Sequence, residues 1–183
     1  NNKPIRLELE TEEKVYPYVL ISFQEKGMML FYKTTILTDS GVNWYFAFYD
    51  VNLKKISSKD ISINENLSYI KDYNHNDTLY LFFQDKSKKS KQDSYCIIEM
   101  DLIAGKHRLF KDILPDEGNV KSFFVFDNKV FMTFNSEEEY ETILVKNLNS
   151  GEVEDLMAFD RNVIEIEKVI VDSTDKSLNL VLK

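Results

Sequence analysis

The chain has 183 residues, of which 43% are hydrophobic, 13% aromatic and 30% charged, and its formal net charge at pH 7 is -8. This composition is typical of a globular protein that can bury a stable hydrophobic core. The acidic balance argues against a nucleic-acid partner, because phosphate binding needs a positively charged surface. No apolar run reaches the roughly 20 residues of a membrane-spanning helix, so no transmembrane segment is expected.

The single cysteine, Cys96, rules out an internal disulfide framework and a CxxC metal or redox pair. Because it lies in an apolar stretch, it is expected to be a buried small hydrophobe. The sequence begins at Asn1, with neither a methionine nor a basic and apolar leader. This start suggests either a processed, exported protein or a designed chain.

Alternation of apolar and polar residues from Ile5 to Glu10 predicts one isolated strand at the start of the chain. A unit of four predicted strands follows over residues 14–62. Tight turns are expected at Gly27 and after Asp50, because glycine and aspartate favour turn conformations. Between the second and third strands the sequence predicts a long loop, Thr34 to Asn43.

The same order of strands and turns recurs along the rest of the chain. The second unit covers residues 63–113, the third covers 114–159, and residues 160–183 supply half of a fourth. The second strand of each unit carries an apolar triplet at alternate positions, and successive triplets start about 50 residues apart. The triplets are Met28, Leu30 and Tyr32; Leu79, Leu81 and Phe83; Val130, Met132 and Phe134; and Leu178, Leu180 and Leu182. The turns before them are centred on Gly27, Asp77, Asn128 and Asp175.

Four short antiparallel strands in about 50 residues are typical of one blade of a β-propeller. The sequence therefore predicts an all-β fold, a single propeller-type domain over residues 1–183 with about three and a half blades. Three interpretations of the half blade stay open: the chain is part of a larger propeller, the strand Ile5 to Glu10 closes a four-bladed ring, or the fold is another meander or sandwich. An uncovered apolar edge on the half blade would favour self-association.

With these triplets and turns the chain resembles the β-propeller repeat proteins of the bacterial envelope, broadly the TolB-like propellers, over essentially its whole length. The resemblance implies an exported, periplasmic or cell-surface location and a role as a binding module. The sequence has no Gly-His and Trp-Asp pairing, no kelch Gly-Gly pair and no Asp-box. The resemblance therefore transfers no functional residue.

The predicted binding face lies where the longer loops gather, at the end of the blades that holds the connections between second and third strands and between units. Its candidate residues are Trp44, Tyr45, Glu65, Lys88, Lys89, Asp116, Glu117, Glu138, Glu139, Asp160 and Arg161. The lysines and the glutamates belong to two loops of opposite charge, which form ordinary solvated loops, a bipolar docking surface or a charge match between blades. Trp44 and Tyr45 suggest a platform for stacking a sugar, although packing within a sheet is the better-supported interpretation.

No catalytic, metal or cofactor motif is present in the sequence. The segment Asp72 to Asp77 begins like a calcium loop but lacks the carboxylate required at the twelfth position. His75 and His107 have no nucleophile or ligand motif beside them and are expected to be surface histidines. The sequence thus predicts a non-catalytic binding or scaffold module with a protein or glycan partner and no cofactor. The alternative is a propeller-type glycoside hydrolase or lyase that uses loop carboxylates such as Asp116 and Glu117.

Overall fold

The computed structural model describes residues 17–85, 94–114, 118–136, 141–159, 166–172 and 177–182. Nearly all of these residues belong to β-strands, and the one helical element is a single 3-10 turn, η1 (Gln24–Lys26). The strands are β1 (Tyr18–Ser22), β2 (Met28–Thr38), β3 (Gly41–Tyr49), β4 (Lys55–Ile63), β5 (Leu67–His75), β6 (Thr78–Asp85), β7 (Ser94–Asp101), β8 (His107–Ile113), β9 (Gly118–Phe126), β10 (Lys129–Ser136), β11 (Glu141–Asn147), β12 (Val153–Phe159), β13 (Ile166–Asp172) and β14 (Ser177–Leu182).

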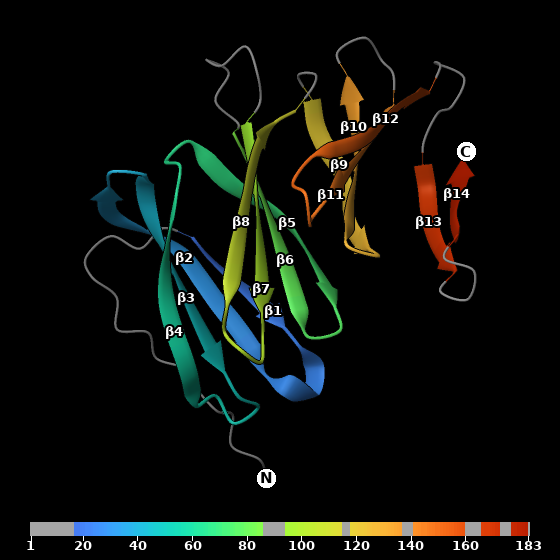
Figure 1. Ribbon diagram of the computed structural model, residues 1–183. Helices are drawn as coiled ribbons and strands as arrows, with labels where there is room; N and C mark the ends of the chain where they lie inside the picture. The colour runs from blue at the N-terminus through green and yellow to red at the C-terminus, as the bar shows by residue number, and fades with distance from the viewer. Residues whose placement is uncertain are drawn as a thin grey trace. The chain divides into compact units, whose positions relative to one another are not determined.

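The prediction of an all-β fold is confirmed, since these strands form antiparallel sheets that follow the order of the chain (Figure 1). Three sheets have four strands each, in the orders β1-β2-β3-β4, β5-β6-β7-β8 and β9-β10-β11-β12. A two-stranded sheet, β13-β14, follows them. The chain divides into two compact units, residues 1–65 (unit 1) and residues 66–183 (unit 2).

The predicted tight turns at Gly27, Asp77 and Asn128 lie between the first and second strands of the three four-stranded sheets, as expected. The turn predicted at Asp175 and the strand predicted from Ile5 to Glu10 lie outside the described residues. Gly27 has a φ of 110°, and a Cβ atom added to it would lie 2.0 Å from the carbonyl oxygen of Tyr49. This turn therefore requires glycine, both for its backbone conformation and for the space beside β3.

The turns between third and fourth strands share a local hydrogen-bond pattern. Asp50, Asp101 and Asn147 each begin such a turn, and the Oδ1 atom of each accepts two backbone N–H hydrogen bonds from the residues that follow. Short polar side chains can substitute for a backbone acceptor in this way, which is why Asp and Asn are common at turns. In unit 2 the turns of one sheet are also joined to each other: Leu102 N–H donates to Asp77 O at 2.9 Å, and Leu148 N–H donates to Asn128 O at 2.8 Å.

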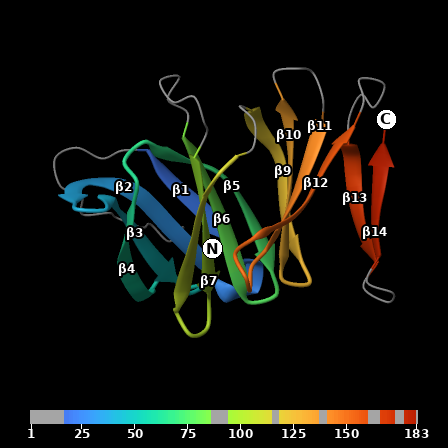
Figure 2. The same ribbon diagram turned by 45° about the horizontal axis from the view of Figure 1, so that its top comes forward.

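The described core of unit 2 lies between the sheets β5–β8 and β9–β12, which lie side by side in Figure 2. The first sheet contributes buried aromatic and aliphatic side chains from β6 and β7, and the second contributes apolar side chains from β9, β10 and β11. The ring centroids of Phe82 and Phe123 are 5.4 Å apart across this core. Interdigitated side chains between two antiparallel sheets are the usual way to bury one face of each.

The prediction of a long loop from Thr34 to Asn43 is wrong. β2 continues to Thr38 and β3 begins at Gly41, so only Asp39 and Ser40 form the connection. The reason is local: this stretch contains three threonines, one isoleucine and one valine, whose branched side chains favour strands, and the two strands meet at an Asp-Ser-Gly turn. The result is a long hairpin in place of a loop.

Candidate binding site

Three residues of the predicted binding face lie in the described part of unit 1: Trp44, Tyr45 and Glu65. The other eight lie outside the described residues: Lys88, Lys89, Asp116, Glu117, Glu138, Glu139, Asp160 and Arg161. Only the first sheet therefore supplies geometry for this face.

Trp44 is buried within β3, with 6% of its surface exposed. Its ring centroid lies 6.2 Å from that of Phe31 on β2. Tyr45 points to the other side of the sheet, where it is half-buried and packs against Tyr32 at 5.3 Å. Both side chains therefore pack within the sheet, and the buried indole of Trp44 presents no face on which a sugar could stack.

In unit 1 the connection between the second and third strands, which belongs to the predicted face, is the far end of the β2–β3 hairpin. We call this the hairpin end and define it by Ile36, Leu37, Thr38, Ser40 and Ser62. Leu37 is 70% exposed and Ile36 is 54% exposed, so two adjacent aliphatic side chains lie in solvent. Single apolar residues are ordinary on a protein surface, so Ile36 and Leu37 make the hairpin end a candidate contact site only together with the polar groups beside them.

A bulge in β2 explains why these side chains face outward. Lys33 pairs with Trp44 and Leu37 pairs with Val42, so β2 has two more residues than β3 between these pairs. The hydroxyl of Thr34 stabilises the bulge, because it donates to Asn43 O at 2.8 Å and accepts from Ile36 N–H at 3.2 Å. Bulges redirect side chains and are frequent beside functional sites.

Three hydroxyl groups lie together beside the aliphatic pair. Ser62 Oγ on β4 is 2.5 Å from Thr38 Oγ1 and accepts a hydrogen bond from Ser40 Oγ at 2.9 Å. The tight backbone approach depends on Gly41, since a Cβ atom there would lie 2.0 Å from Ile63 O. The hairpin is thereby fixed to the end of β4, and its apolar tip is bordered by groups that can donate or accept hydrogen bonds.

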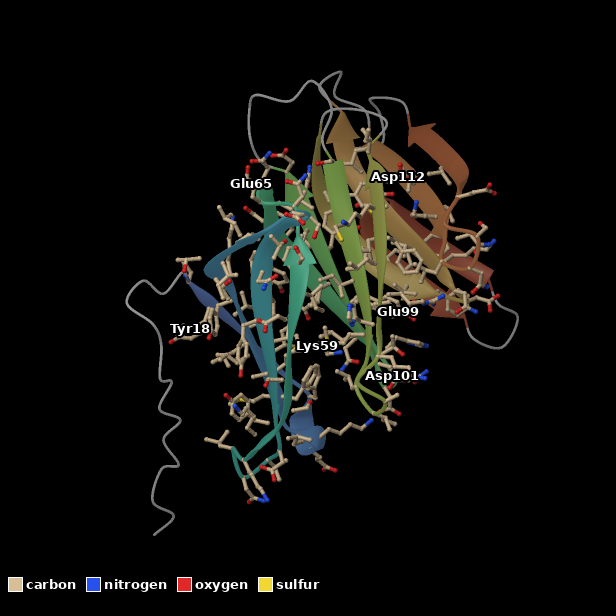
Figure 3. The ribbon with its side chains drawn as sticks, turned by 60° about the vertical axis from the view of Figure 1, so that its left-hand side comes forward. Tyr18, Lys59, Glu65, Glu99, Asp101 and Asp112 are labelled. Atoms are coloured by element: carbon tan, nitrogen blue, oxygen red, sulfur yellow. The ribbon has the colours of Figure 1, made fainter. Side chains whose placement is uncertain are left out.

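Glu65 lies at the same end of the sheet, just beyond β4 and well separated from Lys59 on that strand (Figure 3). Its backbone carbonyl accepts a hydrogen bond of 2.7 Å from Lys33 Nζ. This hydrogen bond joins β2 to the segment after β4. The hairpin end is therefore held by a second contact, in addition to the cluster of three hydroxyl groups. Glu65 is exposed.

Unit 2 contains a separate cluster of polar groups between its two four-stranded sheets. Lys146 on β11 is 2% exposed, and its Nζ lies 2.6 Å from Asp112 Oδ2 on β8 and 5.9 Å from the centre of the Tyr95 ring. Partial burial would raise the pKa of Asp112, but the hydrogen bonds from Lys146 and from Ile113 N–H, with the lysine charge, lower it. Burial, and secondarily the Asp112 charge, raises the pKa of Tyr95. Figure 3 shows Asp112 at the end of β8 that is away from the Asp101 turn.

The remaining candidate chemistry is located as follows. His75 and His107 are exposed, as predicted, and β5 continues through His75, so most of the calcium-like segment is strand. Cys96 is fully buried, as predicted, and burial raises the pKa of its thiol to about 11. Among the described residues, no group of three or more His, Cys, Asp or Glu side chains is placed to hold a metal ion.

Sequence reasoning missed both the hairpin end and the polar cluster of unit 2. The sequence feature that indicates the hairpin is the run of β-branched residues before the Asp-Ser-Gly turn. The polarity of the threonines in this run is equally typical of a loop. Lys146 lies within the apolar strand β11, and its partner Asp112 is 34 residues away in the sequence, so only the packing of two sheets reveals its role.

The chain matches no known protein-family model, and no curated protein resembles it significantly. In the part of the chain that the structure describes, no helix has the length and apolar character needed to cross a bilayer.

Proposed function

We propose that the chain is a non-catalytic binding or scaffold module that contacts a protein partner through the hairpin end of unit 1. The observation that carries the proposal is the exposure of Ile36 and Leu37 beside three hydroxyl groups on a bulged and cross-linked hairpin. An apolar centre with a rim of hydrogen-bonding groups is the usual composition of a protein contact.

A β-propeller-type assembly of blades is the architecture that we propose for this module. Its support is the shared strand order of the three four-stranded sheets and the face-to-face packing of two of them in unit 2. In such an assembly the hairpin end and its counterparts gather at one end of the blades. The resemblance to envelope propellers supports an exported, periplasmic or cell-surface location.

A protein partner fits the hairpin end better than a glycan does. Sugar sites commonly offer an exposed aromatic ring, whereas Trp44 is buried and the exposed side chains at the tip are aliphatic. Aliphatic groups gain from burial against another apolar surface.

The proposal can be tested by placing a photo-crosslinking amino acid at Leu37 and exposing the folded chain to an extract of its source organism. Ile103 provides a matched control, because it is 80% exposed and lies in the turn between β7 and β8, at the opposite end of its own sheet. We expect a protein that is cross-linked from position 37 and not from position 103.

The captured protein is then purified and its affinity measured by calorimetry. Leu37→Asp should weaken binding at least about tenfold, because it places a charge in the apolar contact, and Ile103→Asp should leave the affinity unchanged. Equal cross-linking from both positions, or equal effects of both substitutions, would reject the hairpin end as the site.

A further inference from the structure

Strand β8 is an edge of the sheet β5-β6-β7-β8, since in the described part of the chain it pairs with β7 alone. The hydrogen bond of 2.9 Å from Asp101 N–H to Lys106 O fixes the phase of this pairing. Backbone groups along an antiparallel strand point alternately toward and away from the neighbouring strand. Those of Phe110 therefore face β7, whereas those of Leu109 and Lys111 point away from the sheet. We call this edge the β8 edge and define it as residues 106–113.

The outward backbone groups at the middle of the β8 edge are available for pairing. Among the described residues, Leu109 and Lys111 have no hydrogen-bond partner on the side away from β7. Nearer the end of the strand, by contrast, Ile113 N–H already donates to Asp112 Oδ1 at 2.9 Å. An exposed row of unpaired donors and acceptors is the surface to which an added β-strand binds.

The β8 edge is positively charged, although the chain as a whole carries a net charge of -8. Three of its four charged residues are exposed cations, namely Lys106, Arg108 and Lys111. Its one acid, Asp112, is bound to Lys146, and Glu99 of β7 is bound to Arg108. Lys111 forms no ion pair within the part of the chain that the structure describes, so its charge is available to a partner.

We propose that the β8 edge binds an extended acidic peptide of a partner protein as an added β-strand. The peptide backbone pairs with Leu109 and Lys111, and a carboxylate opposite Lys111 forms a cross-strand ion pair. Like charges on paired strands repel, so Lys106 and Lys111 disfavour a basic strand such as β8 of a second copy. This site belongs to unit 2 and is independent of the hairpin end.

Fluorescence anisotropy of a labelled peptide of alternating valine and glutamate, titrated with the full chain, tests the proposal. Valine favours an extended strand and glutamate supplies the charge. The chain should bind this peptide, and Lys111→Glu should weaken binding about tenfold, because it replaces an attraction by a repulsion. Lys55→Glu is the matched control, since Lys55 is an exposed lysine on β4, the fourth strand of the sheet in unit 1, and should leave the affinity unchanged.

Two further peptides separate strand addition from simple attraction between charges. A peptide of alternating glycine and glutamate has the same charge but a low preference for strands, and it should bind at least about tenfold more weakly. A peptide of alternating valine and lysine should not bind, because its charges oppose those of the β8 edge.

Amide hydrogen exchange, followed by NMR, makes the test specific to the backbone of β8. In the free chain the amides of Leu109 and Lys111 should exchange faster than that of Phe110, and the valine–glutamate peptide should protect both. The proposal would be overturned if this peptide did not bind, if all three peptides bound equally, or if Lys111→Glu and Lys55→Glu had equal effects. Binding without protection of Leu109 and Lys111 would also overturn it.

Discussion

Lys146 Nζ lies 2.6 Å from Asp112 Oδ2, so an ion pair joins β11 of one sheet to β8 of the next across the core of unit 2. The lysine is almost fully buried, whereas the aspartate remains partly accessible to water. Because the lysine is buried, water screens the attraction between the two charges only weakly. Because the aspartate keeps part of its hydration, the desolvation cost of the pair is reduced.

Lys146→Ala should lower the free energy of unfolding by about 2 to 3 kcal/mol, because it removes the ion pair and the buried stem of the lysine. Urea unfolding provides the measurement. The control is Arg108→Ala, which breaks the pair between the exposed Arg108 and Glu99 on the sheet that carries Asp112. An exposed pair contributes little, so this control should cost less than about 1 kcal/mol. Equal losses in the two variants would contradict the structural role of Lys146.

The pH dependence of stability should report the same ion pair. The folded-state pKa of Asp112 is lowered from its unfolded value, so its contribution to stability is present above the unfolded pKa of about 3.9 and is lost as pH falls through the folded value. The wild type should therefore lose more stability than Asp112→Asn between about pH 5 and pH 2. If the free energy of unfolding depended on pH in the same way for both proteins over this range, the proposed role of the Asp112 ion pair would be contradicted.

Tyr95→Phe should leave stability unchanged or raise it by up to about 1 kcal/mol at pH 7. The Tyr95 hydroxyl is buried and has no hydrogen-bond partner among the described residues, so its removal relieves a desolvation cost, while the ring keeps its contact with Phe82 at 5.7 Å. The raised pKa of Tyr95 gives a second readout, since the wild type should lose stability above about pH 10 and the variant should lose less. A loss of 2 kcal/mol or more at pH 7 would show that the hydroxyl is satisfied.

Leu81→Ala should lower the free energy of unfolding by about 2 to 5 kcal/mol. Leu81 has no exposed surface, and neither have Leu79 and Phe83 of the same triplet, so the substitution leaves a cavity. The denaturant midpoint of purified protein measures the effect. An unchanged midpoint would mean that this triplet faces water.

Two glycines should respond differently to alanine. Gly105 has a φ of 65° and open space where a Cβ atom would lie, so Gly105→Ala should cost only the backbone term of about 1 kcal/mol. Gly41→Ala should cost at least about 3 kcal/mol, because its Cβ atom would lie 2.0 Å from Ile63 O. Thermal unfolding of both variants tests the difference, and similar losses would contradict it.

How much could be predicted from the sequence varied with the range of the interactions involved. The turns at Gly27, Asp77 and Asn128 depend on local chemistry of glycine, asparagine and aspartate, and their positions were predicted correctly. Alternation at period two marks the β6 triplet as one apolar face, and its three side chains are buried, whereas Met28 and Tyr32 in the corresponding β2 triplet are only half-buried.

The remaining features depend on contacts between distant residues or on competing local signals. The hairpin end has the polar composition of a loop because of its threonines, but their branched side chains favour strands, and this second preference prevails in the structure. The ion pair between Asp112 and Lys146 joins residues on different sheets, and no periodicity within one strand encodes it.

The burial of β6 has a consequence for how the second sheet folds. Seven consecutive residues, Leu79 to Asp85, are buried, so this strand has no water-facing side to distinguish one alignment from an alignment shifted by one position. The information that selects the alignment must come from its boundaries, namely the two-residue turn at Asn76 and Asp77 and the backbone bond from Leu102 N–H to Asp77 O. Disruption of this turn or of this hydrogen bond would therefore produce kinetically trapped chains in which β6 pairs out of register, in addition to a shift in the folding equilibrium.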